Sequence, residues 1–137
     1  MIPREDKSIL VAARALLIAT AVWAALTGWA YIVPNGQDLP QLSWVKVLIP
    51  GYIWGIAWIG AAGMTLSGLK FPRMVRYGLA AVAGLLVVWA MSFTLSWIED
   101  SSRAWVSAKN YAYLAVLVAS SSVLLASKGK CSASDKQ

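Results

Sequence analysis

The chain has 137 residues, of which 59% are hydrophobic and 13% charged, and its formal net charge is +6. A soluble domain is about half apolar and about one quarter charged, and a small domain exposes much of its surface, so this composition excludes an ordinary soluble globule. The basic residues lie between apolar runs without interleaved aromatics, which argues against nucleic-acid binding and favours contacts with anionic lipid headgroups. We therefore expect an integral membrane protein with the lipid bilayer as its first partner.

Four segments are long and apolar enough to span a membrane, which requires about 20 mostly apolar residues. They lie at about 8–33, 43–66, 74–98 and 105–127, and turn-forming or charged stretches separate them at 34–40, 68–73 and 99–103. The first span is long, carries Arg14 and shows no clear cleavage site, so we do not interpret it as a cleaved signal peptide. The sequence predicts an all-α four-helix membrane bundle in residues 1–127, followed by a polar, basic tail at 128–137 that is too short to fold alone.

The basic residues predict the orientation of the spans, because Lys and Arg are enriched on the cytoplasmic side of membrane proteins. Nine of the twelve lie on the side that holds both termini and the 68–73 loop, namely Arg4, Lys7, Arg14, Lys70, Arg73, Arg76, Lys128, Lys130 and Lys136. The other side holds Lys46, Arg103 and Lys109. We therefore expect a multi-pass protein of the cytoplasmic (inner) membrane with both termini in the cytoplasm.

Aromatic residues mark the opposite, outer ends of the spans. Tryptophan and tyrosine prefer the membrane–water interface, where their rings meet lipid and their polar atoms meet water. The predicted outer aromatic belt consists of Trp29, Tyr31, Trp44, Trp97 and Trp105. This distribution agrees with the orientation that the basic residues indicate.

The second span carries an unusual face of glycine and tryptophan. At about 100° per residue, one face holds Gly51, Trp54, Gly55, Trp58 and Ala62. In lipid, two glycines four residues apart allow the backbone of a partner helix to approach closely. Two interpretations follow: the face closes one bundle, or it joins separate copies into an oligomer. Within one chain, the matching small residues are Ala80 and Gly84 on the third span and Ala108, Ala112, Ala115 and Ala119 on the fourth.

Trp54 and Trp58 differ from the interfacial tryptophans because they lie near the bilayer centre. A buried indole N–H requires an acceptor, and a backbone carbonyl freed beside Pro50 is one candidate. We expect both rings to pack inside the bundle.

The sequence contains no obvious reaction centre. It has no histidine and a single cysteine, Cys131, so it offers no internal disulfide, no histidine ligand and no histidine base. No acid lies deep within a span, which argues against a proton-coupled carrier. Arg14 is a charge within the first span, which indicates a functional residue, but it lies close enough to the cytoplasmic end for its side chain to snorkel to the headgroups. At the outer end of the fourth span, Asn110, Tyr111 and Tyr113 form a cluster for anchoring or for a partner. We expect a non-enzyme without a cofactor.

Four short spans, a basic tail and the stretches GYIWGIAWIG (51–60) and RAWVSAKNYAY (103–113) resemble small four-span membrane proteins of phages that infect actinobacteria, some of which are holins. The resemblance implies a protein that accumulates in the cytoplasmic membrane, oligomerises and opens lesions, with Gly51 and Gly55 on the association surface. The second methionine is Met64, so the paired start codons that some holins use are absent.

Two alternatives remain. The first is an accessory or assembly subunit of a larger membrane complex, whose tryptophan-rich faces would be buried against a membrane protein partner. The second is a small channel or exporter, but the sequence lacks the glutamate in the first span of small multidrug exporters and the asparagine and phenylalanine motifs of four-span fluoride channels. Stable co-purification with a partner would favour the first alternative.

Overall fold

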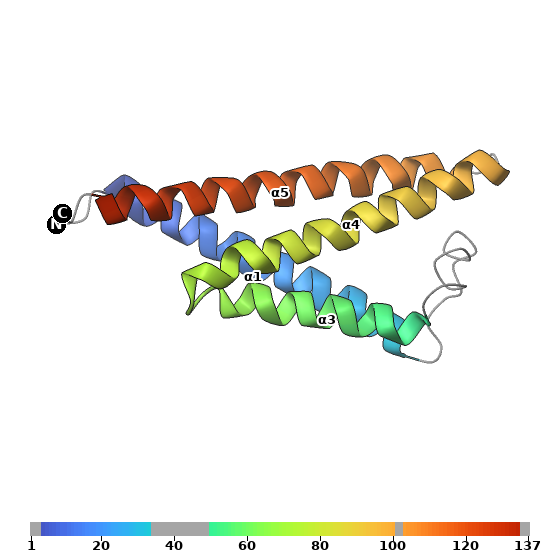
Figure 1. Cartoon of the computed structure of the whole chain (residues 1–137), viewed down its shortest axis with the longest axis horizontal. Coiled ribbons are helices and arrows are strands. Elements are labelled where there is room, and N and C mark those ends of the chain that lie inside the picture. Colours follow the sequence, from blue (N-terminus) through green and yellow to red (C-terminus); the bar gives the residue numbers. More distant parts are fainter. Residues whose placement is uncertain (1–3, 34–49, 101–102, 135–137) are drawn as a thin grey trace.

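The computed structural model describes residues 4–33, 50–100 and 103–134, and it describes side chains for 9–33, 50–99 and 103–123. Over these ranges the chain forms α-helices and no strands (Figure 1). The helices are α1 (Arg4–Ile32), α3 (Gly51–Ser67), α4 (Pro72–Asp100) and α5 (Ala104–Ser134). The prediction of an all-α protein is confirmed, and helices end close to each expected break.

The end of α5 differs from the sequence-based expectation. The fourth span was expected to end at residue 127, but the helix continues to Ser134 and includes much of the segment predicted to be a tail. Extending an existing helix adds one hydrogen bond for each residue that is ordered, so a polar segment can continue a helix that it could not nucleate. The start of the expected second span, residues 43–49, lies outside the described residues.

A tight turn joins α3 to α4. Within it, the Phe71 backbone N–H donates to the Ser67 carbonyl at 2.8 Å, and Pro72 then begins α4. Proline is well suited to this first helical position because its missing N–H would have no partner there. Gly68 allows the first turn of α4 to come close, since a Cβ at this position would lie 2.8 Å from Val75 Cγ2.

The helices pack in chain order: α1 lies against α3, α3 against α4, and α4 against α5. Figure 1 shows the start of α1, the α3–α4 turn and the end of α5 at one end of the long axis. We call this the turn end. The opposite end, which holds the start of α3 and the end of α4, we call the far end. From the turn end, α3 and α4 separate toward the far end (Figure 1).

Two of the described helices are long and apolar enough to cross a membrane: Ile9–Ile32 of α1 and Pro72–Glu99 of α4. Only 17% of the apolar window of α1 is buried inside the protein, against 50% for α4. Helix α3 has 17 residues, which is shorter than the roughly 20 that a span requires. The structure therefore supports two of the four expected spans by length and composition.

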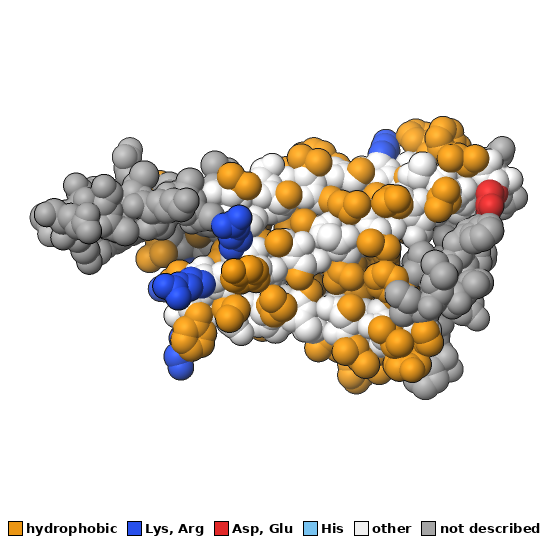
Figure 2. All heavy atoms as spheres, in the orientation of Figure 1, with side chains coloured by type: hydrophobic (Ala, Val, Ile, Leu, Met, Phe, Trp, Pro, Cys, Tyr) orange, Lys and Arg blue, Asp and Glu red, His pale blue; other side chains and the backbone are white. Residues whose placement is uncertain are grey.

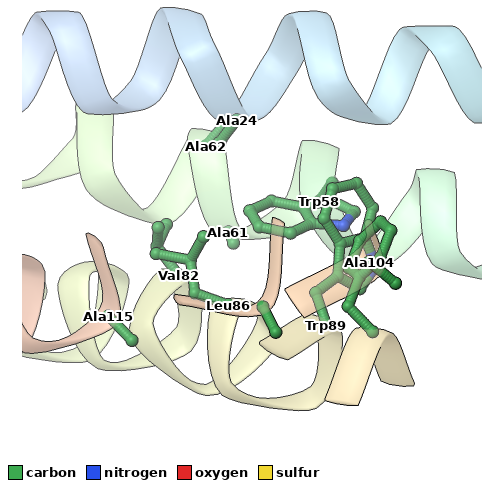
Figure 3. Packing of buried hydrophobic residues seen from close by; sticks show 11 residues of the cluster. Ala24, Trp58, Ala61, Ala62, Val82, Leu86, Trp89, Ala104 and Ala115 are labelled. Carbon is green, nitrogen blue, oxygen red and sulfur yellow. The ribbon is translucent and has the colours of Figure 1, made fainter. Parts of the chain in front are cut away.

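Side chains from each of the described helices form the hydrophobic core (Figure 3). The large buried side chains of α4 recur every three or four residues, which places these positions on one face of the helix. These positions are Leu79, Val82, Leu86, Trp89 and Phe93. They pack against small buried residues such as Ala24 of α1, Ala61 of α3 and Ala108 of α5. The combination of large and small side chains brings the four helices around a set of aromatic rings.

Candidate functional site: an aromatic core and an apolar groove

The interior contains a set of aromatic rings in mutual contact, contributed by every described helix. At its centre, the ring centroids of Trp58 and Trp89 are 5.2 Å apart with an interplanar angle of 61°, and Figure 3 shows the two side chains meeting between α3 and α4. Tyr111 of α5 contacts Trp89 at 5.1 Å, and Tyr31 of α1 contacts it at 5.4 Å. Edge-to-face pairs of this kind contribute about 0.5–1.5 kcal/mol each beyond the burial of their area.

Two further contacts extend this set of rings. Trp23 of α1 meets Trp58 edge-on at 5.4 Å, and Phe93 of α4 stacks on Tyr111 at 5.3 Å with an interplanar angle of 14°. We define the aromatic core as Trp23, Tyr31, Trp58, Trp89, Phe93 and Tyr111. Because these rings come from every described helix, the aromatic core determines how the α1–α3 pair and the α4–α5 pair meet.

Three buried indole groups have no hydrogen-bond acceptor among the described residues. They are the Nε1 atoms of Trp54, Trp58 and Trp89, and Trp58 itself is 0% exposed. A buried donor without an acceptor costs about 1–3 kcal/mol. A carbonyl beside Pro50 was the predicted acceptor for these indole groups. The Pro50 carbonyl itself accepts the Ile53 backbone N–H at 3.0 Å. Trp58 is buried as expected, whereas Trp54 is only half-buried.

Two glycines bring α1 and α3 into backbone contact beside the aromatic core. A Cβ at Gly28 would lie 2.7 Å from the carbonyl oxygen of Gly55, and a Cβ at Gly55 would lie 2.6 Å from Ile32 Cγ1. Only glycine fits at either position, which is how small residues act at helix interfaces in membranes. Gly55 therefore packs against α1 of the same chain. Gly51, the other half of the predicted pair, has nothing within 4 Å of a Cβ built on it.

A second close crossing joins α3 to α4 near the turn end. A Cβ at Gly78 would lie 2.6 Å from the backbone nitrogen of Thr65 and 2.7 Å from its Cα. Thr65 is fully buried, and its Oγ1 donates to the Ala61 carbonyl at 2.8 Å, so the hydroxyl is satisfied within α3. Gly28 and Gly78 were not among the predicted packing residues. The pair Ala24 and Gly28, four residues apart, is a signal that would have indicated the first crossing.

Four of the six small residues predicted on the third and fourth spans, Gly84, Ala112, Ala115 and Ala119, line an open groove between α4 and α5 with a volume of about 590 Å³, whereas Ala108 lies in the hydrophobic core. Gly84 lies in this groove and has nothing within 4 Å of a Cβ built on it, while Ala80 is exposed. Among the described residues of the lining, Thr94 alone has a polar side chain, and its Oγ1 donates to the Ala90 carbonyl at 2.8 Å. We call this the α4–α5 groove; its lining is Ala83, Gly84, Val87, Ala90, Met91, Thr94, Leu95, Ala112, Ala115, Val116 and Ala119.

The predicted aromatic belt is only partly on the surface. Trp29, Trp97 and Trp105 are exposed near the far end, whereas Tyr31 turns inward and joins the aromatic core. Lys109 places its Nζ 4.9 Å from the ring centroid of Trp105. Trp44 and Lys46 lie outside the described residues.

The remaining candidates are mostly on the surface. Arg14 is exposed on α1, as are Asn110 and Tyr113 on α5, whereas Tyr111 belongs to the aromatic core. Ser121 Oγ donates to the Leu117 carbonyl at 2.8 Å, one helical turn back, as its position predicts. Among the described residues, no three His, Cys, Asp or Glu side chains come together as a metal site would require.

The described site is thus a set of packing surfaces: an aromatic core with unpaired donors, two glycine crossings and an open apolar groove. Comparison of the chain with protein-family models, with curated proteins and with solved structures finds no match.

Proposed function

We propose that this chain is a non-enzymatic, multi-pass protein of the cytoplasmic membrane that self-associates and permeabilises the bilayer, as a phage holin does. The observation that carries the proposal is the apolar outer surface of the folded chain. Val11, Leu26, Ile98 and Val123 are each 65–69% exposed, and they lie on α1, α4 and α5. Apolar patches this extensive are rare on soluble monomers and mark contacts with membranes or other proteins. In Figure 2, hydrophobic side chains extend along the visible face, with basic side chains grouped near the start of α4 and acidic ones at the opposite end.

The α4–α5 groove is the surface that we assign to self-association. Gly55 already packs against α1, so a second copy would meet the groove beside Gly84 instead of the Gly51–Gly55 face. We assign α1 of the next copy as the occupant, because the apolar window of α1 is only 17% buried. A contact between two different surfaces can repeat from copy to copy and build rings or larger assemblies. Such growth suits a protein that opens lesions once it has accumulated.

The test is inducible expression in a bacterial host while membrane potential and growth are followed over time. Gly84→Leu fills the groove, and the open space at this position lets the fold accommodate the side chain. Gly60→Leu is the matched control, since a Cβ there also meets nothing within 4 Å and Gly60 is not part of the groove lining. Gly55→Leu is a poor test because its side chain would collide with Ile32 of the same chain.

We expect the wild type and Gly60→Leu to depolarise the membrane abruptly after a delay, and Gly84→Leu to remain polarised at equal abundance. Depolarisation by Gly84→Leu at the wild-type time would contradict the role of the groove. Normal potential with abundant wild-type protein in the membrane would contradict the permeabilising function. That second result would favour an accessory subunit, and a pull-down experiment would then identify its partner.

A further inference from the structure

The turn between α3 and α4 combines basic and aromatic side chains on its surface. Lys70, Arg73 and Arg76 are all exposed, Phe71 is 55% exposed and Tyr77 is 61% exposed. We call these five residues the basic turn. In Figure 2, basic side chains gather near the start of α4 with hydrophobic side chains among them.

No acidic side chain pairs with the charges of the basic turn among the side chains that the structure describes. The sequence has no Asp or Glu between Asp38 and Glu99. The side chains of Arg73 and Arg76 have no hydrogen bond or ion pair in the part of the chain that the structure describes, and the Lys70 Nζ lies 5.7 Å from the ring centroid of Phe71. Since Arg73 and Arg76 are three residues apart on one helix, their guanidinium groups lie on the same side of α4. The result is a compact positive surface with an exposed apolar ring beside it.

The position of this surface along the molecule restricts what it can meet. Helix α4 is one of the two helices long and apolar enough to cross a membrane, and the basic turn lies at its start. A rigid base supports it, because Gly68 packs on Val75 and Gly78 packs on the Thr65 backbone. Charges at the end of an apolar span lie at the depth of lipid headgroups. The far end carries fewer basic residues among those described: Arg103 and Lys109 lie there with the acidic Glu99, and Lys109 lies over Trp105.

We propose that the basic turn binds the phosphodiester headgroup of an anionic phospholipid in the leaflet that it faces; this rests on the membrane location in the proposed function. The two guanidinium groups match the geometry of phosphate oxygens, and Lys70 adds a further charge. Phe71 and Tyr77 lie at the membrane–water interface, where aromatic rings are favoured, and keep the cations at headgroup depth. The far end, with its mixed charges, lacks this selectivity.

Direct binding tests the assignment, using the full chain purified in a neutral detergent and titrated with fluorescent phosphatidylglycerol or phosphatidylcholine. The test variant combines Lys70→Gln, Arg73→Gln and Arg76→Gln, which are exposed positions whose replacement leaves the core intact. The matched control combines Arg103→Gln and Lys109→Gln at the far end. Circular dichroism establishes that both variants keep the helix content of the wild type.

We expect the wild type and the far-end control to bind phosphatidylglycerol more tightly than phosphatidylcholine, and the triple variant to lose this preference. Each basic residue near an anionic lipid surface contributes about fivefold, so the triple substitution should weaken phosphatidylglycerol binding by up to about a hundredfold. Unchanged binding by the triple variant would overturn the proposal, as would an equal loss in the far-end control. Displacement of the lipid by millimolar inorganic phosphate would also overturn it, because it would indicate a site for free phosphate.

This experiment is independent of permeabilisation. A wild-type chain that binds phosphatidylglycerol but leaves membrane potential unchanged in cells would contradict only the holin-like function. A chain that depolarises cells while its triple variant binds phosphatidylglycerol normally would contradict only the lipid site.

Discussion

Gly28 of α1 and Gly55 of α3 face each other so closely that a Cβ on Gly28 would lie 2.7 Å from the Gly55 carbonyl oxygen. This contact holds the α1–α3 pair at backbone distance beside Trp58. It uses within one chain a glycine for which contact between chains was the alternative interpretation. Gly55 therefore contributes to the stability of the fold, independently of the function of the protein.

Replacing Gly55 by Ala should destabilise the protein, because the new methyl group meets Ile32 and the Gly28 carbonyl oxygen. Overpacking of this kind costs about 1–3 kcal/mol. Thermal unfolding in detergent, followed by circular dichroism, measures the change. Gly60→Ala is the control, and it should be neutral or slightly stabilising because alanine is the better helix former and a Cβ there meets nothing within 4 Å. Equal melting temperatures for the two variants would contradict the crossing.

Gly78→Ala should be at least as costly as Gly55→Ala, because the atoms nearest its new Cβ are the backbone nitrogen and Cα of Thr65. Backbone atoms cannot rotate away as the end of a side chain can, so α3 and α4 would have to separate. The same unfolding assay tests this, with Gly63→Ala in open space as its control. A Gly78→Ala variant as stable as Gly63→Ala would show that the two helices do not cross at Thr65.

Trp58→Phe should cost much less free energy of unfolding than Trp58→Ala. Phenylalanine keeps a ring in the aromatic core and removes an indole N–H that lacks an acceptor among the described residues, whereas alanine leaves a large cavity. Replacing a buried aromatic side chain by alanine costs about 3–5 kcal/mol. In Trp58→Phe, removal of the unpaired N–H offsets about 1–3 kcal/mol of the smaller packing loss. Trp29→Phe, at a residue that is 63% exposed, should change stability very little. If Trp58→Phe were as damaging as Trp58→Ala, the indole N–H would have a strong partner.

Trp89 and Tyr111 should show coupling in a double-mutant cycle, because their rings join α4 to α5 at a centroid distance of 5.1 Å. Replacing each by Leu singly and together should give an interaction energy of about 0.5–1.5 kcal/mol in unfolding experiments. The pair Trp89 and Trp29 serves as the control, since Trp29 is mostly exposed and lies outside the aromatic core. Additive effects for Trp89 and Tyr111 would contradict the contact.

The helical class and the positions of the breaks could be predicted from sequence because both depend on local features. The length of each apolar run predicts a helix, and turn residues such as Gly68 and Pro72 end or begin a helix within a few residues of their own position. The continuation of α5 to Ser134, past the predicted end of the fourth span, could not be read from composition, because helix propagation into a polar segment depends on the preceding helix. Membrane crossing by α3 and α5 is a prediction that stays open to experiment.

The partners of individual residues were harder to predict. Periodicity indicated that Gly55, Trp58 and Ala62 share a face, and all three are buried, but it did not indicate that α1 covers Gly55. Tyr31 illustrates the same gap. Its place near the end of a span predicts its depth, whereas the rotation of α1 decides that the ring contacts Trp89 instead of lipid.

Dye release from vesicles tests the central claim most directly. The full chain would be reconstituted at increasing protein-to-lipid ratios into phosphatidylcholine–phosphatidylglycerol vesicles loaded with a self-quenching dye, and insertion would be verified by flotation. A chain that self-associates to permeabilise the bilayer should release no dye at low ratio and release it steeply above a threshold, with Gly84→Leu shifting that threshold upward and Gly60→Leu leaving it in place. Intact vesicles at every ratio, with the protein inserted, would contradict the account.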